Sequence, residues 1–147
     1  MPEKTAAEFR ADGFFITGDL ATATEDGRLT LVARAKDLII SGGYNVYPRE
    51  VELVLNSFAG IADSAVVGVP HPDFGEGVIA VVEMQAGAAP VDPAALIAHA
   101  AQDLASYKLP KRVYTLDALP RNALGKVLKH ELASQFGDSF KKGVGGK

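Results

Sequence analysis

A lysine close to the C-terminus is the strongest candidate for chemistry in this chain. Lys126 ends the sequence Leu-Pro-Arg-Asn-Ala-Leu-Gly-Lys at residues 119–126, in which Pro, Asn and Gly favour turns. Lys126 is therefore expected on a loop or in the first turn of the helix that follows. An ammonium group placed there is a compact, mobile point charge suited to a phosphate or carboxylate oxygen. The other interpretation of a Gly-Lys pair is a solvated surface lysine.

Other glycine and polar patterns do not indicate a nucleotide loop or a metal site. Position 120 is Pro where a Walker phosphate loop needs Gly, and Val127 stands where that loop needs Ser or Thr. The letters Gly-Glu-Gly-Val-Ile-Ala at residues 75–80 run into an expected strand, whereas a dinucleotide fingerprint opens a helix. His71, Asp73 and Glu76 are explained as polar turn residues, and no metal site is predicted.

Two further segments have the composition of a ligand-binding surface. Residues 107–112 read Tyr-Lys-Leu-Pro-Lys-Arg, in which Tyr107 can stack on an adenine ring and Lys111 can contact phosphates. The alternative for this segment is a solvated loop ahead of a strand. Gly42 and Gly43 lack side chains and so allow a close approach, and their alternative interpretation is a simple turn.

The apolar pattern predicts the elements that position these residues. Two β-branched runs bounded by Gly and Pro indicate strands, and apolar residues at helical spacing indicate helices. The expected strands are residues 38–40, 61–69, 78–84 and 113–116, and the expected helices begin at Pro48, after the cap Asp92, and before Leu128. About three helices packed on a small mixed sheet make this an α+β fold.

The first 32 residues are expected to form an arm. A turn at Asp26-Gly27 separates the short apolar runs at residues 14–16 and 29–32, and two strands about such a turn make a hairpin. Isolated hairpins are marginally stable in water, so this arm is expected to need a larger partner.

Composition limits the classes of function. The chain has 147 residues, enough for one compact domain, with 48% hydrophobic residues, 22% charged residues and a formal net charge of −3. A net negative charge argues against nucleic acid or an anionic membrane surface as a partner. The absence of cysteine, of a signal peptide and of a membrane-spanning run predicts a cytoplasmic protein.

Three blocks together resemble the conserved C-terminal motifs of the adenylate-forming superfamily, which includes acyl-CoA synthetases, luciferases and peptide-synthetase adenylation domains. They are Thr-Gly-Asp at residues 17–19, residues 34–52, and residues 119–126. Peptide-synthetase domains usually carry Lys-Ile-Arg-Gly where this chain has Ile-Ser-Gly-Gly at residues 40–43, so the resemblance favours a CoA ligase. Residues 9–19, 68–78 and 119–127 look most like the malonyl-CoA synthetase subgroup.

The resemblance implies a role for each matching residue. Lys126 would enter the active site of the N-terminal domain and contact the substrate carboxylate and the α-phosphate of ATP. Asp19 and Arg34 would contact the nucleotide ribose, and Lys36 would be the hinge of a domain rotation. The CoA-binding residues would be Gly42, Gly43, Tyr107 and Lys111.

The implied reaction has two steps. A carboxylate and Mg-ATP give acyl-AMP and pyrophosphate with the Lys126 loop docked, and after rotation about Lys36 the thiol of CoA displaces AMP. The implied cofactors are ATP, CoA and Mg²⁺, with Mg²⁺ bound mainly by the N-terminal domain. That domain and a small carboxylic acid are the implied partners, and acetylation of Lys126 would remove the charge used in the first step.

The resemblance also implies a domain organisation. Residues 1–35 would be the end of the N-terminal adenylation domain and its hairpin arm, residues 36–140 the mobile C-terminal domain, and residues 141–147 a flexible tail. Met1 would then be an internal methionine, and the isolated fragment is expected to be inactive. Two alternatives stay open, namely a free-standing CoA-binding or regulatory module and a structural interaction domain with an apolar patch around Phe14 and Phe15.

Overall fold

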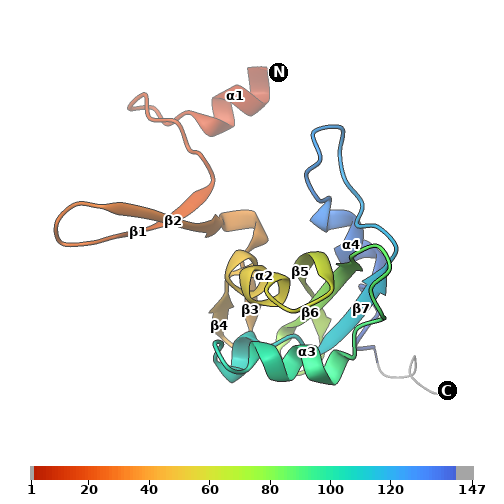
Figure 1. Ribbon diagram of the computed structural model, residues 1–147. Coiled ribbons are helices and arrows are strands. Elements are labelled where there is room, and N and C mark those ends of the chain that lie inside the picture. The colour runs from red at the N-terminus through yellow and green to blue at the C-terminus, as the bar shows by residue number, and fades with distance from the viewer. Residues whose placement is uncertain (1, 142–147) are drawn as a thin grey trace. The chain divides into compact units, whose positions relative to one another are not determined.

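The computed structural model describes residues 2–141, and its contacts divide the chain into two compact units at residues 37 and 38 (Figure 1). The first unit ends at Asp37 and the second begins at Leu38. Of the flexible tail predicted at residues 141–147, all residues but Lys141 lie outside the described part of the chain. None of the helices in residues 2–141 has the length and apolar character needed to cross a membrane.

The first unit contains one helix and one antiparallel hairpin. Its elements are α1 (Pro2–Glu8), β1 (Asp19–Ala23), β2 (Leu29–Arg34) and the 3₁₀ helix η1 (Ala35–Asp37). The predicted hairpin about Asp26-Gly27 is confirmed, with β1 paired to β2. The prediction that residues 14–16 form its first strand is wrong. Gly13 and Gly18, with φ of 86° and 74°, turn the chain on both sides of that run, which contributes only one isolated bridge between Phe15 and Phe9.

The second unit is built on a five-stranded mixed sheet with β6 at its centre. The strands are β3 (Ile39–Ser41), β4 (Tyr44–Val46), β5 (Ile61–His71), β6 (Gly75–Met84) and β7 (Arg112–Leu116). β5 runs antiparallel to β6 along its whole length, while β7 lies parallel to the second half of β6. β3 joins β6 only at the pair Ser41 and Gly75, and β4 lies outside β3. β5 is therefore an edge strand, with one row of backbone groups unpaired by the sheet.

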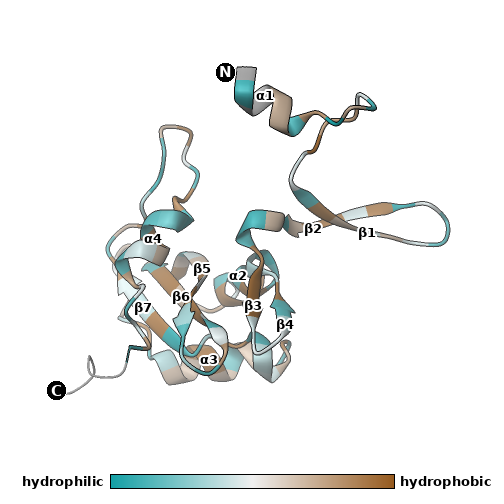
Figure 2. Cartoon of the chain, turned by 180° about the vertical axis from the view of Figure 1, so that it is seen from behind, coloured by the Kyte–Doolittle hydropathy of each residue, from teal (hydrophilic) through white to brown (hydrophobic). Residues whose placement is uncertain are grey.

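Helices cover both faces of this sheet. α2 (Pro48–Asn56) and α3 (Pro93–Ala100) pack on one face, and α4 (Lys129–Gln135) packs on the other. Because side chains alternate along a strand, β6 contributes residues to two apolar cores. One core includes Val78, Ala80 and Val82, and the other includes Ile79 and Val81. In Figure 2 the apolar residues, drawn brown, follow these strands.

Most predicted elements of this unit are confirmed, as is the α+β fold class. Asp92 caps α3, since its side chain accepts a hydrogen bond from the Ala94 N–H at 3.1 Å. The strand predicted at residues 38–40 begins at Ile39, and only Ile39 is buried whereas Ile40 is half exposed. β4 was not predicted. The pair Gly42-Gly43, with φ of 59° and 82°, turns the chain back into a tight hairpin rather than ending the strand.

Candidate active site

Lys126 lies on a short hairpin-like loop between β7 and α4. An isolated antiparallel bridge joins Arg121 to Val127, and the Leu128 N–H donates to the Pro120 carbonyl at 2.8 Å. α4 begins three residues after Lys126, at Lys129. The chain therefore enters and leaves this loop side by side, and Lys126 lies near its returning end.

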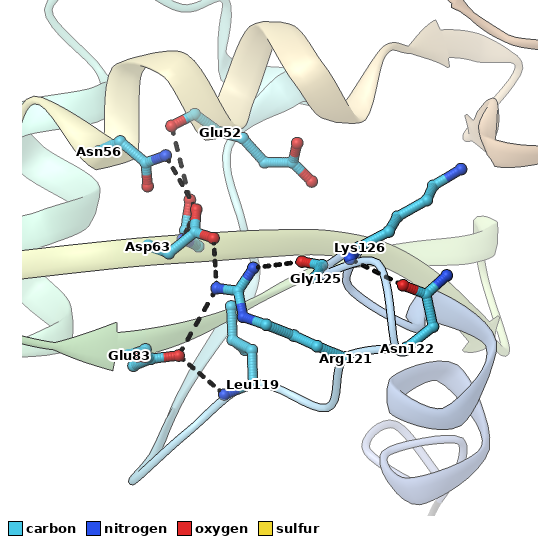
Figure 3. A network of polar contacts seen from close by, with 10 residues as sticks. Glu52, Asn56, Asp63, Glu83, Leu119, Arg121, Asn122, Gly125 and Lys126 are labelled. Carbon is cyan, nitrogen blue, oxygen red and sulfur yellow. Dashed lines mark hydrogen bonds and ion pairs between the residues drawn. The ribbon is translucent and has the colours of Figure 1, made fainter.

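The peptide group that precedes Lys126 is held at both ends. The Lys126 N–H donates to Asn122 Oδ1 at 3.0 Å, and the carbonyl of the same peptide group, on Gly125, accepts from Arg121 Nη1 at 3.0 Å (Figure 3). Asn122 Oδ1 also accepts from the Leu124 N–H at 3.0 Å, an Asx-type turn. Gly125 has a φ of 81°, which a residue with a side chain adopts only with strain.

Arg121 connects this loop to the sheet. Its Nη2 lies 2.6 Å from Asp63 Oδ2 on β5 and 3.7 Å from Glu83 Oε2 on β6. The Glu83 carboxylate also accepts a hydrogen bond from the Leu119 N–H at 2.9 Å, just ahead of the loop. These backbone and side-chain contacts together fix where the loop leaves the sheet.

The Asp63 and Arg121 side chains stabilise each other's charged form. Partial burial by itself raises the pKa of Asp63, but hydrogen bonds from Arg121, the Ser64 N–H and Asn56 outweigh it and hold that pKa below its ordinary value. The hydrogen bond to Asp63 raises the pKa of Arg121 above its ordinary value. The pair stays ionised throughout the neutral range.

A second ion pair holds the other side of the loop. Lys129 Nζ, in the first turn of α4, lies 2.6 Å from Glu52 Oε1 on α2. Glu52 is only 6% exposed, and its Oε1 also accepts the Val66 N–H at 2.9 Å, a backbone group of β5 that β6 does not use. Glu52 and Asp63 thus cover part of the unpaired edge of β5, and Arg121 and Lys129 neutralise them.

Asp63→Asn is expected to destabilise the chain in a pH-dependent way. The lowered pKa of Asp63 means that its carboxylate contributes stability above the unfolded-state value of about 3.9 and loses that contribution as the pH falls through the folded-state value. The difference in melting temperature between wild type and Asp63→Asn should be constant near neutral pH and shrink below about pH 4. Thermal unfolding from pH 7 to pH 3 measures it, and a difference that does not change with pH would contradict this assignment.

The Lys126 side chain itself has no partner within residues 2–141. It is exposed, no hydrogen bond or ion pair involves its Nζ, and in Figure 3 it extends away from the network that fixes its backbone. A fixed backbone with an unpartnered ammonium group can present one positive charge to another molecule or domain.

The structure brings together the predicted ribose-contacting residues of the first unit. Asp19 and Arg34 are opposite each other on β1 and β2, and Arg34 Nε lies 2.9 Å from Asp19 Oδ1. The Asp19 N–H donates to Thr17 Oγ1 at 3.2 Å. Lys36, the predicted hinge, is exposed in η1 and lies one residue before the end of this unit.

The two glycines of the β3–β4 turn have different surroundings. The Gly42 N–H donates to the Phe74 carbonyl at 2.9 Å, and a Cβ on Gly42 would lie 3.0 Å from the Phe74 ring. A Cβ on Gly43 would meet no atom of the described residues within 4 Å, apart from Gly43 and its neighbours in sequence. Gly42 is therefore needed for packing and backbone conformation, whereas Gly43 has open space in front of it.

Two aromatic side chains connect these glycines to the other predicted CoA-binding residues. Tyr44 stacks on Tyr107 with ring centroids 4.7 Å apart and planes 25° apart. Lys111 Nζ lies 4.2 Å from the centroid of the Phe74 ring. We call this surface the aromatic face, and it consists of Gly42, Gly43, Tyr44, Phe74, Tyr107 and Lys111.

Sequence reasoning missed Tyr44 and Phe74. Both flank turn glycines, Tyr44 directly after Gly43 and Phe74 directly before Gly75, and an exposed aromatic residue beside a turn was the available signal. Tyr44 is 59% exposed and Phe74 41% exposed, so both rings are accessible.

The basic segment at residues 107–112 does not act as a single cationic patch. Lys108 Nζ forms an ion pair with Glu50 Oε1 at 2.6 Å, and Arg112 lies 5.4 Å from the Phe140 ring. The hydrogen bond to Glu50 raises the pKa of Lys108. Of this segment, Tyr107 and Lys111 belong to the aromatic face, and the Lys108 Nζ that pairs with Glu50 lies 5.8 Å from the centroid of the Tyr107 ring.

The Lys126 loop and the aromatic face lie on different sides of the second unit. In Figure 1 the loop ahead of α4 projects from one side, and the β3–β4 hairpin lies at the other. The sheet and helix α2 lie between them in this view.

No group of three or more acidic or histidine side chains that could hold a metal ion occurs within residues 2–141. The polar residues around the β5–β6 turn have structural partners instead. His71 Nδ1 accepts the Asp73 N–H at 3.1 Å, and its ring lies between those of Phe74 and Phe140 at 4.6 Å each. Glu76 accepts the Ile40 N–H at 2.7 Å and so fastens β3 to the sheet.

Comparisons with known proteins indicate one protein family. The model of the AMP-binding enzyme C-terminal domain matches residues 50–126. The 2-succinylbenzoate–CoA ligase of Geobacillus kaustophilus is 48% identical over 131 residues, which are 89% of this chain and 26% of that protein. The feruloyl-CoA synthase of an Amycolatopsis species is 46% identical over 136 residues, 92% of this chain and 27% of the relative.

Solved structures of acyl-CoA ligases also resemble this chain. The crystal structure of ATP-bound MatB from Rhodopseudomonas palustris is 50% identical and superposes with a TM-score of 0.85, over 96% of this chain and 28% of that one. The chain thus spans little more than a quarter of the length of the proteins that it matches.

Proposed function

The chain belongs to the family of AMP-binding enzyme C-terminal domains, and from that premise we propose that it supplies the catalytic lysine and the CoA-binding surface of an ATP-dependent acyl-CoA synthetase. The observation that carries this proposal is Lys126, an unpartnered ammonium group on a loop whose backbone is held at both ends. The ligase as a whole would convert a carboxylate, ATP and CoA to acyl-CoA, AMP and pyrophosphate.

Lys126 serves the first step. A carboxylate oxygen attacks the α-phosphorus of ATP, the bond to the pyrophosphate oxygen breaks, and negative charge spreads over the equatorial oxygens in the transition state. An ammonium group already in place stabilises that charge without reorganisation. The described residues offer Lys126 no competing anion, so its charge is available to the substrates held by the N-terminal domain.

Asp19 and Arg34 serve nucleotide binding. A carboxylate accepts hydrogen bonds from the two vicinal hydroxyls of a ribose, and a guanidinium donates to the same sugar. Their 2.9 Å ion pair on neighbouring strands supports this role, because each side chain fixes the other's orientation before the nucleotide arrives. Lys36 lies in η1 beside the division between the units, which supports its proposed role as the hinge.

The aromatic face serves the second step. After rotation it would face the acyl-adenylate, and the thiol of CoA would attack the acyl carbon and release AMP. The open space in front of Gly43 suits a narrow pantetheine arm. Exposed Tyr44 and Tyr107 rings suit stacking with an adenine base, and Lys111 suits a phosphate.

Malonate or a related short-chain acid is the proposed substrate. The support is the likeness of residues 9–19, 68–78 and 119–127 to malonyl-CoA synthetases, and the 50% identity to MatB. Other relatives of similar identity are named for larger aromatic acids, so the acid is decided by the pocket in the N-terminal domain. Mg²⁺ would also be held mainly by that domain, since the described residues bring together no metal ligands. A cytoplasmic location is proposed from the cysteine-free sequence.

The exposed apolar residues of the first unit support a large missing neighbour. Phe14, Leu29 and Leu31 are each more than 70% exposed, and Phe15 is 51% exposed. Such a concentration of exposed apolar side chains marks a protein-binding surface. We assign it to the remainder of the N-terminal domain.

The test of the proposed function is carboxylate-dependent AMP formation by the complete ligase, in which these 147 residues are joined to their N-terminal domain. Malonate, acetate and medium-chain acids are compared, and the 147-residue chain alone is assayed beside it. We expect malonate-dependent AMP from the complete enzyme and none from the chain alone, because the chain has no phosphate-binding loop. Sustained AMP formation by the chain alone, or no activity with any acid from a folded complete enzyme, would contradict the proposal.

A free-standing CoA-binding module is the second candidate, because every residue of the aromatic face lies in the second unit. That function predicts CoA binding by the 147-residue chain alone. Tyr107→Ala and Lys111→Ala would weaken this binding, whereas Lys126→Ala would leave it unchanged. Titration calorimetry with CoA separates the two candidates when its result is set beside the AMP assay.

A further inference from the structure

Arg121 and Asn122 both bind the peptide group that precedes Lys126, one at its carbonyl and the other at its N–H. The group's carbonyl accepts from Arg121 Nη1 and its N–H donates to Asn122 Oδ1, both at 3.0 Å. A second backbone contact, from the Asn122 N–H to the Lys126 carbonyl at 2.9 Å, holds the opposite side of Lys126. The N–H and the carbonyl of Lys126 are therefore both held, while its side chain is left without a partner among residues 2–141.

The Arg121 guanidinium also binds side chains of the sheet. Arg121 Nη2 reaches Asp63 at 2.6 Å and Glu83 at 3.7 Å, on two neighbouring strands, so the guanidinium ties the loop to the rigid part of the unit. On the returning side, Lys129 is tied to the buried Glu52. An arginine suits this task because its planar fork donates in two directions at once, to the loop carbonyl and to the carboxylates.

Resting on the proposed function, we propose that Arg121 is a positioning residue for adenylation, with Asn122 as its partner on the same peptide group. The ion pair to β5 sets where the loop projects, and the two hydrogen bonds set the direction in which the Lys126 side chain leaves the backbone. Lys126 must reach a phosphate oxygen in another domain, and a displacement of about 1 Å at a reacting group can cost about 10²-fold in rate. Neither residue touches the substrates in this assignment.

Leu124 at the tip of the same loop is consistent with this geometry. It is 92% exposed, although it is an apolar residue, and its N–H is held by Asn122. The hydrogen bonds from Arg121 and Asn122 to the loop backbone thus orient both the apolar tip of the loop and the charged side chain two residues later.

The experiment measures the two half-reactions of the complete ligase separately. Carboxylate-dependent exchange between pyrophosphate and ATP reports adenylation, and release of AMP from supplied acyl-adenylate and CoA reports thioester formation. Arg121→Ala is expected to lower kcat of adenylation about 10- to 100-fold with the KM for ATP nearly unchanged. Thioester formation should stay close to wild type, and Arg121→Lys should restore part of the lost rate because it keeps the charge beside Asp63.

A double-mutant cycle separates positioning from a general effect on folding. If Arg121 acts through Lys126, then Arg121→Ala should cause no further loss of adenylation when Lys126 is already alanine. Asn122→Ala, which removes the acceptor of the Lys126 N–H, should give the same pattern. Lys108→Ala is the matched control, because it removes an ion pair of the same 2.6 Å length from the same unit without touching the loop. It should leave adenylation unchanged.

The outcomes distinguish this proposal from the proposed function. A wild-type ligase without carboxylate-dependent exchange would overturn the proposed function itself. Two results with an active wild type would overturn the positioning role alone. In the first, Arg121→Ala slows both half-reactions by the same factor. In the second, Arg121→Ala lowers the adenylation rate of the Lys126→Ala variant by the same factor as it lowers that of the wild type. Adenylation of Arg121→Ala and Asn122→Ala at the wild-type rate would also overturn it.

Discussion

Lys126→Ala is expected to lower the rate of adenylation by the complete ligase about 10²- to 10³-fold, equivalent to about 2.7–4 kcal/mol of transition-state stabilisation. The loss arises because no other cation of the loop can take its place. Arg121 is occupied by Asp63, and Lys129 is occupied by the buried Glu52. Carboxylate-dependent pyrophosphate exchange measures the effect, and the melting temperature should stay nearly unchanged because the Lys126 side chain is exposed and forms no hydrogen bond or ion pair within residues 2–141.

Lys141→Ala is the matched control for this variant. Lys141 is another exposed lysine of the same unit, and it forms an ion pair with Asp138, three residues away on the surface. Its removal should leave exchange at the wild-type rate. Equal activity of Lys126→Ala and Lys141→Ala would show that Lys126 is a solvated surface residue.

Gly43→Ala is expected to slow thioester formation by about 10²-fold while adenylation continues. The added Cβ would project into the open space that we assign to the pantetheine arm, since no atom of residues 2–141 other than Gly43 and its sequence neighbours lies within 4 Å of it. It would also cost about 1–2 kcal/mol of stability, because φ of 82° is unfavourable for a residue with a side chain. The rate of AMP release from acyl-adenylate and CoA measures the effect.

Gly87→Ala separates the backbone cost from the loss of CoA access. Gly87 has a φ of 78° and, like Gly43, has open space where a Cβ would be added, but it lies in the turn after β6 and outside the aromatic face. Both variants should be destabilised to a similar extent, and only Gly43→Ala should slow thioester formation. A similar slowing by both would mean that backbone strain, rather than blocked access, is the cause.

Local signals were sufficient for most elements of the second unit. Runs of β-branched residues bounded by Gly and Pro predicted β5 and β6, and Asp92 followed by proline predicted the start of α3, because composition and capping act over a few residues. They failed at Gly42-Gly43, where the same two glycines suit either the end of a strand or a tight hairpin. Pairing of β4 with β3 decides between these, and pairing is a property of two segments.

The candidate site likewise has one part that local sequence predicts and one part that it does not. Lys126 could be found from its neighbours in sequence and from the family resemblance, because Pro120, Asn122 and Gly125 predict a turn. The contacts that fix its backbone could not be predicted, because Arg121 and Asp63 are 58 residues apart and meet only when the loop folds over the edge of β5. No local pattern identifies a pair at that separation.

The aromatic face shows that the composition of one segment does not identify which of its residues share a surface. Cations and an aromatic residue gathered within residues 107–112 suggested one patch, but Lys108 and Arg112 turn to partners on other elements. Tyr44 and Phe74, from two different turns, complete the face instead. Exposed aromatic residues next to turn glycines are the better signal for such a surface.

The most direct test of the central claim, that one small domain serves two reactions through two separate surfaces, compares Lys126→Ala and Gly43→Ala in both half-reactions of the complete ligase. The expected result is a crossed pattern. Lys126→Ala loses pyrophosphate exchange and retains thioester formation from supplied acyl-adenylate, while Gly43→Ala retains exchange and loses thioester formation. If both variants slow both half-reactions by the same factor, the two surfaces do not have separate roles and the claim is wrong.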